Sequence, residues 1–123
     1  MAAGDFVKVA AAQLRRASMM LKQEAQGMLN ERERTARRLS SEITDHQLKL
    51  RARQISLNDP NKDDREKQRL GNEVRSLQQQ ISAKQKEMDA VTQNLAQAAN
   101  AKRNKANGLD GRAGDLELQA SSL

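Results

Sequence analysis

Apolar residues recur along the second half of the chain at alternating steps of four and three residues. The positions are Leu70, Val74, Leu77, Ile81, Lys84, Met88, Val91, Leu95, Ala98 and Lys102. This a/d spacing, sustained over about four to five heptads, predicts a coiled-coil helix. A helix cannot bury its own stripe, so the segment requires a partner helix.

The residues before Pro60 carry a second stripe, which changes phase once. The first phase holds Val7, Leu14, Leu21 and Met28, with Ala10 and Ala17 between them, and the next holds Leu29, Ala36, Ile43, Leu50 and Leu57. A slip of one residue is a stutter, which locally relaxes a left-handed supercoil. Gly27 lies inside the slip and costs about 1 kcal/mol relative to alanine, so this stretch is the weakest of the first helix.

Turn and capping residues divide the chain into predicted elements. Proline is tolerated in a turn or a first helical turn but not in a helix interior, so the segment around Pro60 ends one helix and starts another. Asp5 is a candidate N-cap of the first helix, and Asn107-Gly108 is a C-terminal signal of the second. The predicted elements are helix one at about 5–57, a turn at about 58–61, helix two at about 62–107 and a flexible tail at 108–123.

Two long helices joined by so short a turn must lie antiparallel. Folding the chain at Pro60 pairs Leu50 with Leu70, Ile43 with Leu77 and Leu39 with Ile81, and further out Leu14 with Ala106. The two stripes stay in phase in this register. The fold class predicted is therefore all-α, a long antiparallel two-helix coiled-coil hairpin of residues 1–107 with a flexible C-terminal tail.

A hairpin of two helices has a thin core, and charged residues such as Arg53 and Lys67 dilute its seam. Small cores seldom stand alone, which favours self-association into a homodimer or other homo-oligomer with a four-helix core. The residues expected to carry this assembly are Leu39, Ile43, Leu50, Leu70, Leu77, Ile81, Met88, Val91 and Leu95.

Composition narrows the class further. Charged residues make up 31 % of the chain and aromatic residues 1 %, with Phe6 alone, which is typical of exposed helices rather than a globular core. The chain has no cysteine, which excludes disulfides and thiolate chemistry and is compatible with an intracellular, cytoplasmic setting. No apolar run approaches the ~20 residues of a membrane span.

No catalytic, cofactor-binding or metal-binding residues are predicted. His46 is the only histidine and falls at a seam position, where a packed neutral side chain is the usual role. The acids near the turn lack the spacing of a calcium loop, and helix capping explains them better. We therefore expect no enzyme, no cofactor and no small-molecule substrate.

Charge is the feature with most functional potential, because the chain carries a net charge of +6. In the proposed register a cluster that could bind phosphates forms from Arg34, Arg37, Arg38, Lys84 and Lys86. Further groups lie near the open end (Arg15, Arg16, Lys102, Arg103, Lys105) and near the turn (Lys49, Arg51, Arg53, Lys62, Arg65, Lys67, Arg69). The alternative is a solvated coiled-coil flank whose cations pair with nearby acids, such as Arg37 with Glu33.

Two terminal segments leave further alternatives open. Residues 2–22 could lie on a membrane, but the hairpin seam needs the same residues. The apolar face there consists of Phe6, Val7, Ala10, Leu14 and Leu21, with Lys8, Arg15 and Arg16 beside it. The tail from Leu109 is net negative, so it could be a docking peptide, fold back on a basic patch or stay mobile.

These observations favour a non-enzymatic structural or adaptor coiled-coil protein that acts through helix–helix protein interaction and self-assembly. The alternative is a small basic protein that binds nucleic acid or an anionic membrane surface through the Arg/Lys clusters of the hairpin.

Overall fold

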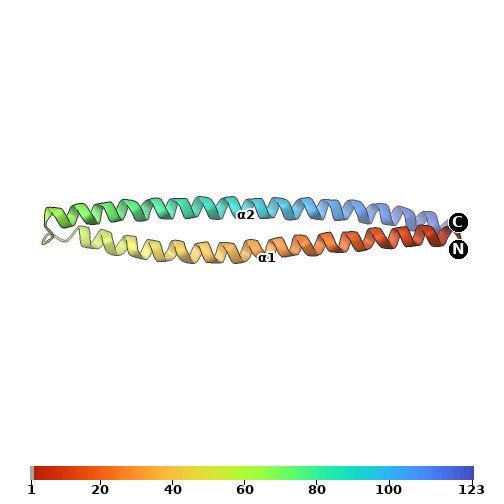
Figure 1. Cartoon of the computed structure of the whole chain (residues 1–123), viewed down its shortest axis with the longest axis horizontal. Helices are drawn as coiled ribbons and strands as arrows, with labels where there is room; N and C mark the ends of the chain where they lie inside the picture. The colour runs from red at the N-terminus through yellow and green to blue at the C-terminus, as the bar shows by residue number, and fades with distance from the viewer. Residues whose placement is uncertain (1) are drawn as a thin grey trace. The chain divides into compact units, whose positions relative to one another are not determined.

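A computed structural model describes residues 2–123 as two long helices and a turn. Helix α1 spans Ala3–Leu57 and helix α2 spans Asp64–Ser121. The two helices lie side by side and run antiparallel (Figure 1), and residues 2–123 contain no strand. The predicted all-α helical hairpin is thereby confirmed.

The hairpin divides into two compact units. Unit 1 joins the part of α1 up to Arg32 to the part of α2 from Asn94 onward. Unit 2 spans Glu33–Gln93 and contains the turn. Each unit is an antiparallel pair of helical segments with its own core.

The turn of unit 2 is built by aspartates. The Asp59 side chain accepts a hydrogen bond from the backbone N–H of Asn61 (2.9 Å), which stabilises a local turn around Pro60. The Asp63 side chain accepts one from the N–H of Glu66 (2.8 Å) and caps the start of α2. The turn is therefore two residues longer than predicted.

The start of α1 also differs from the prediction. The helix begins at Ala3, so Asp5 lies within its first turn and is not the N-cap. Its negative charge still interacts favourably with the positive end of the helix dipole there. This effect is weaker than an N-cap hydrogen bond.

The core of unit 2 follows the predicted seam. Leu39 is fully buried, and Ile43, Leu70 and Ile81 are also buried. The other predicted seam residues are half-buried: Leu50, Leu77, Met88 and Val91 in this unit, and Leu95 in unit 1. All nine predicted seam residues thus lie at least half-buried within the hairpin.

The core of unit 1 is made of small residues at heptad spacing. On α1 the buried positions are Ala11, Ser18 and Ala25, and on α2 they are Ala99, Ala106, Ala113 and Ala120. Small side chains at the contact allow two helix backbones to approach closely. Of the two alanines predicted for this seam, Ala10 is half-buried, whereas Ala17 is exposed and its prediction is wrong.

The predicted end of helix two near residue 107 is wrong. Helix α2 continues to Ser121, and Gly108 has no positive φ, the conformation that a glycine ending a helix usually adopts. The physical reason is the alanine row, whose members Ala113 and Ala120 are buried against α1. Packing of this face outweighs the low helix propensity of the glycines in the segment.

Several large apolar side chains remain outside both cores. They are Phe6, Val9, Met19, Met20, Leu48, Ile55, Leu118 and Leu123, each at least half exposed. Six of the eight lie on α1, so the outer surface of α1 is much more apolar than that of α2.

Candidate functional site

Acidic residues of the last turns of α2 contact basic residues of α1 in unit 1. The Arg15 guanidinium donates to Glu117 (2.6 Å), and the Lys22 ammonium donates to Asp110 (2.7 Å). The partners are seven residues apart on each helix, so the same contact repeats after one heptad. The predicted tail therefore does not fold back as a separate segment: Asp110 and Glu117 belong to helix α2 and contact basic residues of α1 from there.

These contacts favour the charged forms of the residues involved. Hydrogen bonding from Arg15 lowers the pKa of Glu117, and Lys22, followed by Ser18, lowers the pKa of Asp110. Hydrogen bonding to Glu117 raises the pKa of Arg15, which stays charged throughout the working pH range.

A pH dependence of unit 1 follows from the two lowered carboxyl pKa values. A carboxyl with a lowered pKa in the fold contributes stability above its unfolded pKa, and that stability is lost as the pH falls through the folded pKa. We expect thermal stability measured by circular dichroism to fall as the pH drops below about 4. The paired variant Asp110→Asn/Glu117→Gln removes both carboxyls and should show a smaller fall, whereas an equal fall would contradict this assignment.

One polar side chain is enclosed beside these ion pairs. Ser18 is 1 % exposed, and its Oγ has no hydrogen bond of good geometry among residues 2–123, although it lies near the Asp110 carboxyl. It borders a pocket of about 240 Å³ together with Arg15, Met19 and Lys22. Because Asp110 and Glu117 balance the two cations, the pocket has no excess charge to attract an ion.

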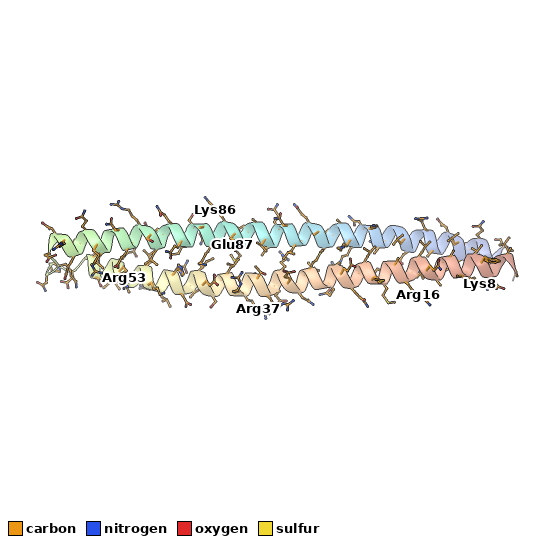
Figure 2. The ribbon with its side chains drawn as sticks, in the orientation of Figure 1. Lys8, Arg16, Arg37, Arg53, Lys86 and Glu87 are labelled. Atoms are coloured by element: carbon orange, nitrogen blue, oxygen red, sulfur yellow. The ribbon has the colours of Figure 1, made fainter. Side chains whose placement is uncertain are left out.

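The basic cluster predicted in unit 2 is not assembled as a single surface. Glu42 accepts from Lys84 (2.8 Å) and from Arg38 (3.3 Å), and Lys84 is the main cause of a lowered pKa of Glu42. Arg37 pairs with Glu33. Figure 2 shows Arg37 and Lys86 pointing away from each other on opposite outer sides of this unit. Arg34 and Lys86 have no ion pair within residues 2–123.

The cations near the turn are also partly neutralised. Arg53, on α1 near the turn (Figure 2), donates to Glu73 (2.7 Å), and Arg69 donates to the same carboxylate (2.9 Å). At the open end of the hairpin, Lys102 donates to Glu24 (2.7 Å). Surface pairs of this kind contribute little stability individually, but they leave fewer cations free for an external anion.

An open groove of about 650 Å³ runs along the edge of the unit 2 seam. It is lined on α1 by Ala36, Ser40 and Thr44, spaced about one helical turn apart, and on α2 by Met88. Glu33, Arg37, Ser41 and Asp45 complete the lining. The serines and threonine were absent from the predicted site, although small residues at a spacing of four are visible in the sequence.

Little in the described residues points to catalysis. His46 is half-buried in the seam, and its Nδ1 has no hydrogen-bond partner within residues 2–123. No group of three or more His, Cys, Asp or Glu side chains in that range could hold a metal ion. Neither helix contains a stretch long and apolar enough to cross a bilayer within the part of the chain that the structure describes.

Comparison of the chain with protein family models, with curated proteins and with solved structures found no match. Functional inference therefore rests on the two surfaces left open by the fold: the groove of unit 2 and the exposed apolar residues of unit 1.

Proposed function

We propose that this chain is a non-enzymatic structural or adaptor coiled coil that self-assembles by helix packing in the groove of unit 2. The observation that carries the proposal is the groove itself, an opening at the seam edge where the apolar residues Ala36 and Met88 remain only half-buried. A helix lying in it would cover the side of the core that the hairpin leaves open.

The thinness of the core supports a requirement for a further helix. Leu39 is the largest apolar side chain that the hairpin encloses completely, while Leu50, Leu77 and Val91 keep part of their surface in water. Burial contributes roughly 25 cal/mol per Å² of apolar surface, so a second layer of helices adds stability that two helices cannot provide. A four-helix core is the usual solution.

A second copy of this chain suits the groove better than a partner of one charge. The rim carries both signs, with Glu33 and Asp45 as acids and Arg37 as a base. In a two-fold interface the same patch meets itself, so a patch with both signs can place an acid of one copy against a base of the other. The small lining residues Ala36 and Ser40 allow close approach of a helix backbone.

The proposal predicts that Ser40→Arg prevents self-association. Ser40 lines the groove and is exposed, so the larger charged side chain occupies the groove without disturbing the seam. Sedimentation equilibrium should show the mass of the wild-type chain rising with concentration to that of a dimer or larger oligomer. The Ser40→Arg chain should stay monomeric at the same concentrations, because its dissociation constant for self-association rises at least tenfold.

Ser82→Arg is the matched control, because Ser82 is an exposed serine of α2 outside the groove. This variant should associate like the wild type. A wild-type chain that is monomeric at all concentrations would overturn self-assembly. Equal association of both variants would place the interface elsewhere.

Binding of nucleic acid or an anionic membrane through Arg34, Arg37, Arg38, Lys84 and Lys86 stays a prediction, and the ion pairs of unit 2 favour it less than self-assembly. Three of these five residues already pair with carboxylates inside unit 2. An external phosphate would have to compete with partners that are held in place by the fold.

A further inference from the structure

The ion pairs of unit 1 distinguish its two flanks. Arg15 and Lys22 meet Glu117 and Asp110 on one flank, which is polar and electrically balanced. Glu24 and Lys102 meet on the opposite flank. On each helix, residues separated from one of these partners by about a whole number of turns lie on the same flank as that partner. Each ion pair therefore shows which other residues share its flank.

The flank marked by Glu24 and Lys102 is apolar at its centre. On α1, Met20, Ala17 and Phe6 precede Glu24 by close to one, two and five helical turns and share its side of the helix. Phe6 is 63 % exposed and Met20 is 60 % exposed. On α2, Leu109 and Leu116 follow Lys102 at heptad spacing and are half-buried at the seam edge of the same flank.

Cations border this apolar strip on both helices. Lys105 and Arg112 lie along the outer edge of the strip on α2, one heptad apart and exposed. On α1, Arg16 lies at the opposite edge and points away from α2 (Figure 2). None of these three has an ion pair among residues 2–123. Of the acids nearby, Glu24 is occupied by Lys102, Glu31 lies seven residues further along α1, and the exposed Asp115 follows Arg112 by three residues.

The strip is not suited to a helix of a second copy. Gln13 interrupts the apolar line between Phe6 and Met20, so a coiled-coil partner would find no continuous heptad seam. A two-fold dimer through this flank would also bring the basic edges close together. A planar lipid surface requires no register, and it accommodates arginine and lysine at the level of the phosphates.

The hairpin seam does not bury Phe6 or Met20. The seam of unit 1 uses Ala11, Ser18 and Ala25, with Leu14 and Leu21 half-buried beside them. Phe6 and Met20 are additional to it. Membrane contact through Phe6 and Met20 therefore does not compete with packing of the hairpin seam.

We propose that this flank of unit 1 binds the surface of an anionic lipid bilayer, with Phe6 and Met20 entering the headgroup boundary and Arg16, Lys105 and Arg112 contacting lipid phosphates. The arrangement is that of an interfacial, non-spanning attachment, in which a small apolar area and several cations act together. It is independent of the groove of unit 2 and adds a membrane-surface role to the proposed assembly.

The test uses the full chain and two kinds of vesicle. One contains equal parts of phosphatidylcholine and phosphatidylserine, and the other contains phosphatidylcholine alone. Co-flotation should show binding to the first kind, weakening as salt is raised, and binding at least tenfold weaker to the second. Phe6→Ser/Met20→Ser and Lys105→Gln/Arg112→Gln should each reduce binding roughly tenfold or more.

Each double variant has a matched control in unit 2. Leu48→Ser/Ile55→Ser changes two apolar side chains that are 63 % and 66 % exposed. Arg51→Gln/Lys86→Gln removes one arginine and one lysine that are exposed and without an ion pair in residues 2–123. Both controls should retain wild-type binding, and circular dichroism should show unchanged helix content in every variant. Ser40→Arg should bind vesicles normally, which separates this proposal from self-assembly.

Two results of the vesicle test, and one in solution, would overturn the inference. One is absence of binding to phosphatidylserine vesicles at low salt. The other is equal loss of binding in the unit 1 variants and their unit 2 controls, which would indicate attraction by net charge alone. If Phe6→Ser/Met20→Ser instead changes the mass of the chain in solution, the flank belongs to a protein interface.

Discussion

Leu39→Ala is expected to destabilise unit 2 by about 2–4 kcal/mol, the largest effect of a single side chain in the hairpin. Leu39 is fully buried, and truncation removes its apolar surface from the core and leaves a cavity in a seam only two helices thick. Urea unfolding followed by circular dichroism measures the change as a lowered midpoint.

Leu48→Ala provides the comparison on the same helix, because Leu48 is 63 % exposed. Both variants replace leucine with alanine, so they share the same small change in helix propensity and differ in burial. The Leu48 variant should stay within about 0.5 kcal/mol of the wild type. If the two variants were equally stable, Leu39 would not face α2 and the register of unit 2 would be incorrect.

The sequence predicted unit 2 well because its core consists of large apolar residues in a regular heptad. Ile43, Leu70 and Ile81 stand out against polar neighbours, and the proline between them places the turn. The prediction of two antiparallel helices needed nothing more than this spacing and a short connection. Exact turn bounds depended on which aspartate caps α2, and Asp63 and Asp64 are equally good candidates by type.

The sequence predicted unit 1 less well because small residues give weak signals. Alanine is common on every face of a helix, so the row of Ala99, Ala106 and Ala113 does not stand out by hydrophobicity. Gly108 followed by further glycines resembles a helix end, and only contact with α1 reveals that the helix continues. Tertiary packing outweighed local propensity here, as it often does.

The candidate surfaces were harder to predict than the fold, because they depend on which cations find partners. Sequence spacing suggested the Arg37–Glu33 pair within one helix. It did not resolve the pairing of Lys84 with Glu42 or of Arg15 with Glu117, which required the register of each unit. The cations that remain unpaired, such as Arg112, became candidates only after these assignments.

Ala113→Leu is expected to destabilise unit 1 by about 1–3 kcal/mol, because Ala113 is fully buried where the two helices approach closely. Added methylenes would force the helices apart and disturb the neighbouring contact between Arg15 and Glu117. Hydrogen exchange should then show reduced protection of backbone amides in unit 1, with those of Glu33–Gln93 unchanged.

Ala101→Leu is the matched control, since Ala101 is an exposed alanine of α2 in the same unit. Leucine and alanine have similar helix propensities, so the difference between the variants reports packing rather than helix formation. Equal protection in both variants would mean that the last turns of α2 do not pack on α1. Burial of the alanine row would then not explain why α2 continues beyond Gly108.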